Sequence, residues 1–413
     1  MTETAFVQPV AEKDRILSLD AMRGLAILGI LAVNVVAFAF PMGVYMNMDL
    51  APAAAGPNGD VWAWVSATFF RQKFITLFSL LFGASVYLLG GERRDPERSP
   101  LIRRRLLWLI LIGLIHGLLL WWGDILMLYG VTGLVVLLCR SWSARRLITV
   151  GLSITLFLAL LGGGAAIAMG FAPPEIQAQA AEQQAGMGGN AEAVAASIAA
   201  YRAGWPGGFL ENAAAWAQLQ SLSVVIFIIP TLGLMLLGMG LLKSGFLAGR
   251  APVWVYGLFV ALGAGVLGAT AWAGWRETVL GAPVMTGLED ALHAFAFVVT
   301  LGYMSVMILA ATRGPKVVAK VFAPAGRMAF TNYLTQSIIM STLFTQPWGP
   351  RLIGQVTWET LALIVAGIWV LQLIWSPLWL SVFRMGPLEW VWRCLTYRRW
   401  TPLRRAPVKT TFG

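Results

Sequence analysis

The sequence predicts an all-α protein: a polytopic integral membrane helix bundle of about ten transmembrane helices, with both termini in the cytoplasm. Hydrophobic residues make up 58% of the 413 residues, only 12% are charged, and the mean hydropathy is +0.73. A soluble domain cannot bury so much apolar side chain, and the apolar runs are continuous rather than alternating as in a β-barrel. This composition excludes a soluble enzyme, a disordered chain and a fibrous protein.

Ten apolar runs are candidate transmembrane helices, because ~20 helical residues cross a hydrocarbon core of ~30 Å. The third run turns sharply at Gly123-Asp124, and the fourth returns from that turn. The second, fourth and ninth runs are short, so we expect them to be tilted, flanked by an interfacial turn or partly re-entrant. The ten runs cover residues of about 22–41, 74–89, 106–122, 125–139, 147–171, 219–242, 253–273, 291–311, 330–344 and 361–383.

Basic residues in the connecting segments predict the orientation. Alternate connections, together with the tail after Phe383, carry twenty-four Lys and Arg, whereas the connections on the other side carry five. Positively charged loops stay on the cytoplasmic side, so both termini are predicted to be cytoplasmic. The net charge of +11 has this origin and does not indicate nucleic-acid binding. The first run contains Arg23 and is followed by many others, so it is interpreted as a retained helix.

The runs are interpreted as a single transmembrane domain, residues 1–413, with one long outer loop at about 172–218. The part of this loop over residues 201–216 is rich in aromatic residues and glycine, and we expect it to lie on the membrane surface. Cys139 and Cys394 are far apart, which gives neither a disulfide framework nor a metal cluster. The sequence leaves the oligomeric state open.

Polar groups within the first run are candidates for function, because such groups are costly in hydrocarbon. Asp20 and Arg23 are one helical turn apart and can pair. Asn34 follows Arg23 by eleven residues, which returns it to nearly the same helix face, ~16 Å deeper. Arg23 is therefore predicted near the cytoplasmic surface and Asn34 near the middle of the membrane. The alternative is that Arg23 snorkels and Asn34 bonds a neighbouring helix.

His116 in the third run is the candidate general base. It lies eleven residues beyond Arg105, so its predicted depth is that of Asn34. Gly113 and Gly117 flank it and would let another helix or a ligand approach closely. Neutral imidazole can take a proton from a hydroxyl or an amine. The alternative is a histidine that only forms a hydrogen bond across the bundle.

Asp124 lies eight residues beyond His116, or ~12 Å along a continuous helix axis. It would orient His116 if the helix breaks at Gly123. Otherwise Asp124 lines the outer mouth of the protein or caps the fourth run. Either way, it belongs to the predicted catalytic set.

A further group of polar residues opens the ninth run, after Arg327. Asn332 and Gln336 share one helix face, and Tyr333 and Ser337 share the next. So many hydrogen-bonding groups are not expected to face lipid. They line either a cavity or a polar helix contact, and we favour the cavity.

Glu289, Asp290 and His293 cluster at the outer end of the eighth run, where we interpret them as an interfacial loop and helix start. His293 and His116 are the only histidines, which excludes a multi-histidine metal site. The sequence contains no phosphate-binding glycine loop, nucleophile elbow or metal-ligand pattern.

Several motifs carry a family resemblance that covers both ends and most of the chain, but not the outer loop. They are Leu19 to Gly24 running to Asn34; Phe74 to Gly83; Gly113 to His116 with Trp122 to Leu126 and Tyr129; Gly326 to Met328 with Thr331 to Tyr333, Gln336 and Ser337; and Gly386 to Trp390 with Arg393. On these motifs the chain resembles the YeiB-like family of bacterial inner-membrane proteins. The resemblance implies location in a bacterial inner membrane.

That family in turn looks like a branch of the transmembrane acyltransferase superfamily. The superfamily includes bacterial O-acyltransferases of surface sugars and the lysosomal enzyme that acetylates heparan glucosamine. The resemblance implies transfer of an acyl group from cytoplasmic acyl-CoA or acetyl-CoA to an acceptor on the far side. Many members carry an arginine and a catalytic histidine eleven residues apart in the first span. Here the arginine matches Arg23, but Asn34 stands where the histidine would be, and we infer that His116 supplies the base.

The leading hypothesis is therefore an acyltransferase, in which Arg23 and Arg327 lie near the donor's phosphates and Asn34 or Asn332 donates to the thioester oxygen. The acceptor would be a small molecule, a lipid or a saccharide, with membrane lipids around the protein and no metal. The alternatives are a transporter or lipid-handling protein that uses the same polar cavity, and a non-catalytic scaffold. The predicted catalytic residues are His116, Asn34 and Asp124. The predicted donor-binding residues are Arg23, Arg327, Asn332, Tyr333 and Gln336.

Overall fold

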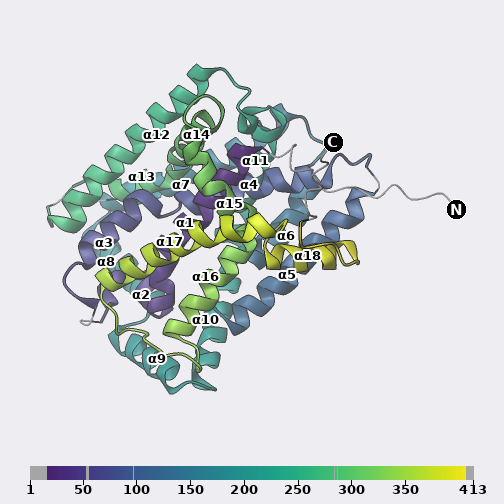
Figure 1. Ribbon diagram of the computed structural model, residues 1–413. Helices are drawn as coiled ribbons and strands as arrows, with labels where there is room; N and C mark the ends of the chain where they lie inside the picture. Colours follow the sequence, from purple (N-terminus) through teal and green to yellow (C-terminus); the bar gives the residue numbers. More distant parts are fainter. Residues whose placement is uncertain (1–15, 53–54, 96, 283, 286, 406–413) are drawn as a thin grey trace, which may run out of the picture.

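The computed structural model describes residues 16–52, 55–95, 97–282, 284–285 and 287–405, and its regular structure is helical (Figure 1). Within these residues there is no β-strand, only an isolated antiparallel bridge between Phe383 and Arg404. The all-α prediction is confirmed for this part of the chain. Lys13, Arg15 and Lys409, which contribute to the charge asymmetry, lie outside the described residues.

The helices follow one another with short connections, and π-helical turns extend three of them. They are α1 (Leu17–Ala39), α2 (Met42–Met46), α3 (Gly59–Val65), α4 (Lys73–Gly90), α5 (Arg98–Leu119), α6 (Leu126–Leu137), α7 (Ala144–Gly170), α8 (Pro174–Gly188), α9 (Ala191–Ala203), α10 (Gly207–Ser223), α11 (Ile229–Lys243), α12 (Val253–Gly274), α13 (Leu288–Ala294), α14 (Ala296–Thr312), α15 (Val317–Arg327), α16 (Ala329–Phe344), α17 (Trp358–Val382) and α18 (Pro387–Tyr397).

About six helical segments of the described chain are long and apolar enough to cross a membrane. A further candidate is the pair α13 and α14, which is bent by 51° at its break. The protein therefore has the helices of a multi-pass membrane protein. The six segments are Leu17–Ala39, Gly59–Gly90, Ala144–Gly170, Ile226–Lys243, Val253–Val279 and Trp358–Val382.

The remaining predicted runs are helical but fall short of a simple membrane span. α6 has 12 residues and α16 has 16. α5 has 22 residues, but four arginines, Arg98 and Arg103 to Arg105, lie in its first turns. The second run, predicted to be short, is instead lengthened by α3 into one segment of 32 residues. All ten predicted runs are therefore helical, but only about six are clear membrane spans. The others are too short or carry too many charged residues.

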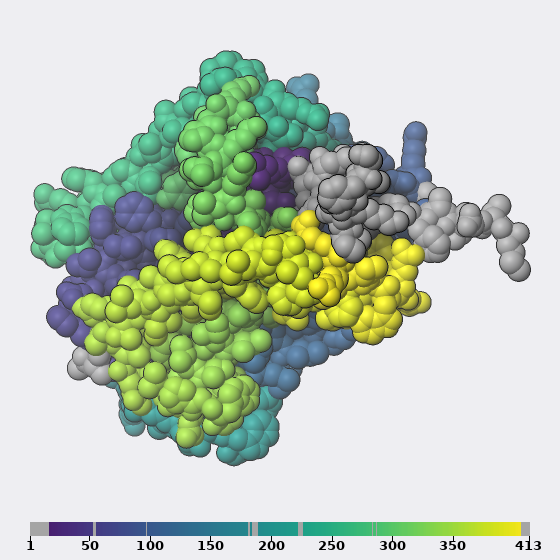
Figure 2. Space-filling model, in the orientation of Figure 1, coloured from purple at the N-terminus to yellow at the C-terminus, as the bar shows by residue number. Residues whose placement is uncertain are grey.

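α1 lies at the centre of the bundle, whereas α7 and α12 lie at its periphery. In the most apolar stretch of α1, 78% of the residues are buried within the protein, against 17% in α7 and in α12. α17 runs across the face drawn in Figures 1 and 2, between α14 and α15 on one side and α16 on the other. Helices α7 and α12 thus present most of their apolar surface outward, as lipid-facing helices do.

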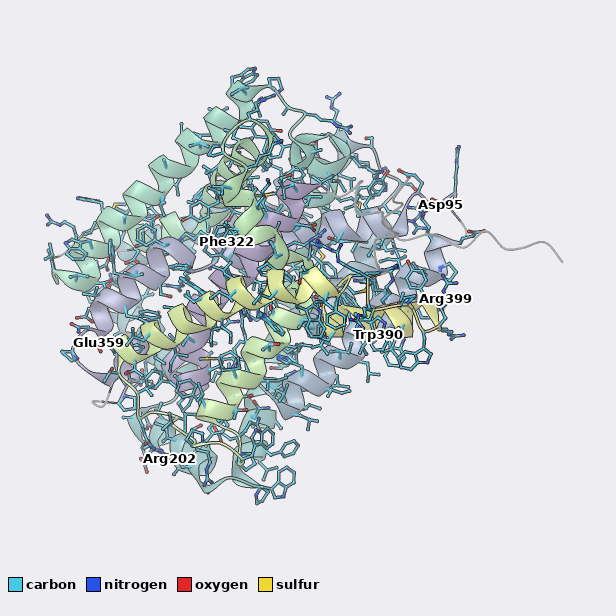
Figure 3. The ribbon with its side chains drawn as sticks, in the orientation of Figure 1. Asp95, Arg202, Phe322, Glu359, Trp390 and Arg399 are labelled. Carbon is cyan, nitrogen blue, oxygen red and sulfur yellow. The ribbon has the colours of Figure 1, made fainter. Side chains whose placement is uncertain are left out.

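Glycines allow the central helices to touch backbone to backbone. A Cβ atom placed on Gly24 of α1 would lie 2.0 Å from the carbonyl oxygen of Phe322 in α15, the residue labelled near the centre of Figure 3. At the crossing of α4 and α11, a Cβ on Gly83 would lie 2.0 Å from the Met235 oxygen, and one on Gly238 would lie 1.9 Å from the Leu80 oxygen. Close approach of this kind is how helices associate without a hydrophobic driving force in lipid.

We expect Gly83→Ala to destabilise the protein by about 1–3 kcal/mol, because the added methyl group meets backbone that cannot rotate away. Gly265→Ala in the peripheral α12 is the matched control, since a Cβ there meets no atom within 4 Å. Thermal unfolding in detergent measures both changes. A loss of stability that is equal in the two variants would contradict the proposed helix crossing.

The predicted outer loop at 172–218 is largely helical, because it contains α8, α9 and most of α10. Its aromatic part does not lie wholly on the surface: Tyr201 is 3% exposed and packs in a core cluster, while Trp205 is 70% exposed. The side chain of Asn212 in α10 donates to the carbonyl oxygens of Gly117 and Leu118, at 2.8 and 2.9 Å. This segment therefore caps the end of α5, whose last carbonyl groups would otherwise lack partners.

Candidate functional site

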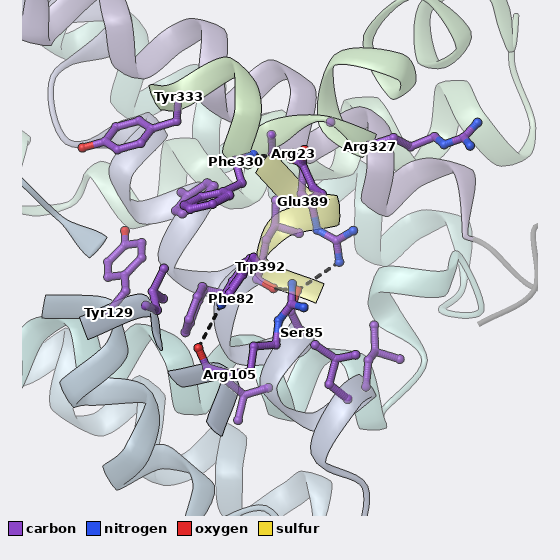
Figure 4. A pocket seen from close by; sticks show the side chains of 18 of the residues that line it. Arg23, Phe82, Ser85, Arg105, Tyr129, Arg327, Phe330, Tyr333, Glu389 and Trp392 are labelled. Carbon is purple, nitrogen blue, oxygen red and sulfur yellow. Dashed lines mark hydrogen bonds between the residues drawn. The ribbon is translucent and has the colours of Figure 1, made fainter. Parts of the chain in front are cut away.

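A cavity of about 360 Å³ lies among α1, α4, α5, α6, α16 and α18 and the end of α15 (Figure 4). Its walls come from the first turns of α1, α5 and α16, the last turns of α4 and one face of α18. Deeper residues of α5 and the start of α6 complete it. The cavity therefore begins at one end of the bundle and extends toward its middle, and its size is typical of a small-molecule site.

Arginines from four different segments line the outer part of the cavity. Arg23 donates to Asp20 at 2.9 Å and to the Ser85 hydroxyl at 3.0 Å. Arg105 stacks on the ring of Trp392, with its guanidinium carbon 3.6 Å from the ring centroid. Since guanidinium groups match phosphate oxygens in geometry and charge, this part of the cavity is suited to an anionic phosphate group. The four lining arginines are Arg23, Arg105, Arg327 and Arg393.

Glu389 of α18 holds the start of α16 in place beside these arginines. Its carboxylate accepts hydrogen bonds from the backbone N–H groups of Phe330 and Thr331, at 2.7 and 3.0 Å, and from the Thr331 hydroxyl. Burial raises the pKa of Glu389 above its ordinary value, and these hydrogen bonds act in the opposite direction. The carboxylate also suits a helix N-terminus, where backbone N–H groups carry partial positive charge.

The inner part of the cavity is apolar and aromatic. Phe78 and Phe82 of α4 pack against the ring of Tyr129 in α6, with centroids 5.4 and 5.2 Å apart. The Tyr129 hydroxyl shares a hydrogen bond of 2.8 Å with the Ser79 hydroxyl. Tyr129 and Tyr333 lie at the opposite side of the cavity from Arg327 (Figure 4). The cavity is therefore divided into a basic part and an aromatic part.

His116 and Asp124 form a buried pair directly behind this aromatic part. α5 ends at Leu119 and α6 begins at Leu126, and the break lets the chain turn back. Asp124 Oδ1 lies 2.9 Å from His116 Nδ1, and Asp124 Oδ2 accepts from the Met127 N–H at 2.9 Å. The two roles that the sequence offered for Asp124 as alternatives, orienting the histidine and capping the next helix, are therefore combined in one carboxylate.

The geometry of this pair fixes the tautomer of His116. Because the carboxylate can only accept, a neutral His116 carries its proton on Nδ1 and has its free electron pair on Nε2. Nε2 is buried and makes no hydrogen bond within the described part of the chain. The ring of Tyr333 lies between His116 and the cavity, with a centroid 5.5 Å from that of the imidazole. A buried histidine nitrogen without a hydrogen bond in the described residues thus lies one side chain away from the cavity.

Two other predicted residues lie in a contact with α17 and not in the cavity. Asn332 donates to the Ser376 hydroxyl at 3.1 Å and accepts from Trp375 Nε1 at 2.9 Å. Gln336 donates to the Gln372 side-chain oxygen at 2.8 Å. This is the polar helix contact that the sequence left as the second choice, so preferring the cavity was wrong for Asn332 and Gln336.

Asn34 is also absent from the cavity lining. It is half-buried on α1, and no hydrogen bond in the described residues joins it to His116. Arg23, Arg327 and Tyr333 do line the cavity, as the donor-site prediction requires. The structure therefore brings three predicted donor-site residues to the cavity and places the predicted base behind Tyr333, outside the cavity lining.

Several residues of the cavity were not singled out from the sequence: Arg105, Tyr129, Glu389, Trp392 and Arg393. In the sequence, Arg105 was used only as a reference point for the predicted depth of His116 in the membrane. Three of the others, Tyr129, Glu389 and Arg393, stand in the motifs that carry the family resemblance. Those motifs were the available signal, because neither helix periodicity nor charge indicates that the tail folds back as α18 against α5.

The second histidine belongs to a separate buried chain of ionisable groups. Lys73 Nζ lies 3.3 Å from His293 Nδ1 and donates to the Ala67 carbonyl oxygen at 2.7 Å. His293 Nε2 lies 3.3 Å from Glu289 Oε1. Lys73 and His293 are 1% and 3% exposed. The helix start predicted at this position is confirmed, because α13 begins at Leu288, and the predicted interfacial position stays a prediction. Among the described residues, no three His, Cys, Asp or Glu side chains gather as a metal site would require.

Fold and cavity together define a multi-pass helical membrane protein with a basic and aromatic internal site. A family model described as "Protein of unknown function (DUF418)" matches residues 241–399. The chain is 32% identical to the uncharacterized protein YxaH of Bacillus subtilis (strain 168), over 97% of this chain and 98% of the relative. It is 33% identical to the uncharacterized protein YeiB of Escherichia coli (strain K12), over 93% and 97%. The chain therefore belongs to the YeiB-like family.

Proposed function

We propose that the protein is an acyltransferase that takes an acyl group from cytoplasmic acyl-CoA, acetyl-CoA included. The acceptor is a hydroxyl or amine of a small molecule, a lipid or a saccharide. One observation carries the proposal: a cavity lined by arginines at one end has an oriented, unpartnered histidine behind its aromatic end. The resemblance to transmembrane acyltransferases supports the same reaction class.

The donor would be held by the arginines of the outer cavity. Arg23 and Arg327 lie there as the sequence predicts, and Arg105 and Arg393 add to the positive charge. Charge-assisted hydrogen bonds to phosphate are strong and short. With the phosphates at this end, the acyl thioester would extend toward Tyr129 and Tyr333.

The transfer step would use His116 as general base. Its Nε2 takes the proton of the acceptor hydroxyl or amine while that oxygen or nitrogen bonds to the thioester carbon. The carbon–sulfur bond then breaks, and the CoA thiolate leaves and takes up the proton. Tyr333 covers His116 on the cavity side, so its ring must swing aside or its hydroxyl must carry the proton. The two amides that the sequence offers as donors to the thioester oxygen, Asn34 and Asn332, both lie outside the cavity lining, and Asn332 is engaged by α17.

Orientation in the membrane is part of the proposal. We propose ten crossings of a bacterial inner membrane, counting α5, α6 and α16 as tilted or shortened spans, with both termini cytoplasmic. The arginines of the cavity then face the compartment that contains acyl-CoA. In Figure 3, Asp95 and Arg399 lie at one end of the bundle, and Arg202 and Glu359 lie at the other.

Reporter fusions placed after Leu89 and after Gly413 should both report a cytoplasmic location, because basic connections flank these positions. Paired reporters that are active only in the cytoplasm or only in the periplasm measure this. A fusion after Gly281 serves as the control and should report the periplasm. A periplasmic signal at either of the first two positions would contradict the orientation.

Arg23→Ala should weaken the binding of the acyl-CoA donor while leaving the general base, His116, in place. We expect the KM for acyl-CoA to rise roughly 10- to 100-fold with a smaller change in kcat, because a charged hydrogen bond to phosphate is lost. Arg250→Ala, which removes an exposed arginine outside the cavity, is the matched control. Initial rates with labelled acyl-CoA in membranes measure the effect. An unchanged KM for acyl-CoA in Arg23→Ala would show that the donor binds at a different site.

Transport is the second candidate function, and the buried chain of Lys73, His293 and Glu289 is the observation that favours it. Ionisable side chains linked by short distances within a membrane protein can pass protons. Two of these residues, Glu289 and His293, lie in α13, the first half of the bent pair α13 and α14, and broken helices often mark transport sites. The two functions differ in which histidine they need, and this difference can be measured.

A further inference from the structure

A second cavity, of about 380 Å³, lies between the start of α5 and the outer face of α18. Three arginines line it, Arg104, Arg398 and Arg399, together with the indoles of Trp108 and Trp400. It is separate from the candidate active site, because the opposite face of α18 carries the residues that line that site. We refer to this second cavity as the α18 groove.

The groove is basic and has a defined shape. No carboxylate is among the described residues that line it. Arg104 donates to the Thr396 carbonyl oxygen at 2.9 Å, which fastens α5 to the last turn of α18. Arg398 follows α18 with a φ of 54°, and this left-handed residue turns the chain back. The return is held by Trp390, whose indole donates to the Thr401 carbonyl oxygen at 2.7 Å.

The side chains around the groove are of the kinds that proteins place at a membrane surface. Trp400 is 80% exposed, and its ring lies 5.1 Å from that of Trp390. Leu107, one residue before the Trp108 of the groove, is 56% exposed. Large exposed apolar side chains beside arginines are costly in water but suit the boundary between headgroups and acyl chains.

We propose that the α18 groove binds the phosphodiester headgroup of an anionic phospholipid from the leaflet on which α18 lies. The arginines would hold the phosphate, and the indoles and neighbouring aliphatic side chains would contact the glycerol and the first acyl carbons. Basic pockets at helix ends recognise such lipids in this way. The proposal rests on insertion of the protein in a membrane and is independent of acyl transfer. A bound lipid would fasten α18, which forms one wall of the candidate active site.

The test compares retention of phosphatidylglycerol and phosphatidylcholine by the purified full-length protein in detergent, measured by native mass spectrometry. We expect phosphatidylglycerol to be retained preferentially. The double variant R398Q/R399Q should weaken its binding roughly 30-fold, since each arginine near a headgroup adds about 1 kcal/mol. The control R145Q/R146Q removes two exposed arginines away from the groove and should change binding less than twofold.

Three results would overturn the proposal. Equal retention of the two lipids by the wild-type protein would show that the headgroup charge is not recognised. Equal losses in the two double variants would show a general effect of surface charge. Displacement of phosphatidylglycerol by millimolar inorganic phosphate would assign the groove to a free phosphate ion. The lipid comparison uses only the wild-type protein, so it decides the question even if R398Q/R399Q folds poorly.

Discussion

His116→Gln should lower the rate of acyl transfer by roughly 10²- to 10⁴-fold, the contribution of a positioned general base. Glutamine keeps the size of the side chain and its capacity for hydrogen bonds, but it cannot usefully accept a proton. The loss should appear in kcat rather than in the KM for the donor, because His116 does not line the part of the cavity that holds the arginines. The measurement is transfer of labelled acyl groups in membranes at matched protein abundance.

His293→Gln is the matched control, because it removes the other buried histidine that faces a carboxylate. We expect it to retain acyl transfer, since the Lys73–His293–Glu289 chain lies outside the cavity. The pair of variants also separates the two candidate functions. Full activity in His116→Gln would make that histidine structural. If, in addition, His293→Gln abolished proton-coupled uptake of a substrate, transport would become the better account.

The pairing of His116 with Asp124 shows what can be predicted from sequence. Gly123 beside Asp124 indicates a turn. In a continuous helix, residues eight apart are too far from each other to touch, so His116 and Asp124 can meet only if the chain turns between them. The break begins earlier than predicted, at Leu120, and the chain resumes as a helix at Leu126. The neighbouring glycines were also interpreted correctly, since Gly113 lies against the start of α6 and Gly117 against Trp216 of α10.

The polar face of α16 shows where such prediction stops. Periodicity places Asn332 and Gln336 on one face, but it does not say what covers that face. The answer lies in α17, where Gln372 and Ser376 are also four residues apart and complement them. The two polar faces are more than thirty residues apart in the sequence, and they match only in the folded protein. The helical period of either segment shows which residues share a face but not which helix covers that face.

The position of the C-terminal tail is even less predictable from the sequence. α18 has 11 residues, too few to cross a membrane, and its sequence mixes arginine with tryptophan. Local propensity allows a helix there but does not fix its partner. Its position depends on distant contacts, such as that of Glu389 with the start of α16 and that of Trp392 with the Arg105 carbonyl oxygen at 3.0 Å. One wall of the cavity was therefore visible only in the folded chain.

Asp124→Asn should be nearly as damaging to acyl transfer as His116→Gln, although it changes a single atom. The asparagine oxygen can replace Oδ2 and still accept from the Met127 N–H, so the start of α6 stays capped. Its amide nitrogen then faces His116 Nδ1 and can only donate. That reverses the tautomer: Nδ1 becomes the acceptor and Nε2 carries the proton, so Nε2 can no longer take a proton from the acceptor.

We therefore expect a loss of roughly 10²- to 10⁴-fold in kcat for Asp124→Asn, with the KM for acyl-CoA and the thermal stability near their wild-type values. Asp124→Ala is the informative comparison, because it removes the cap and the orienting group together. It should reduce stability by about 1 kcal/mol as well as activity. If Asp124→Asn kept its kcat and only Asp124→Ala lost stability, the carboxylate would serve only as a helix cap. His116 would then have no oriented lone pair to offer an acceptor, and the case for general-base chemistry at this site would fail.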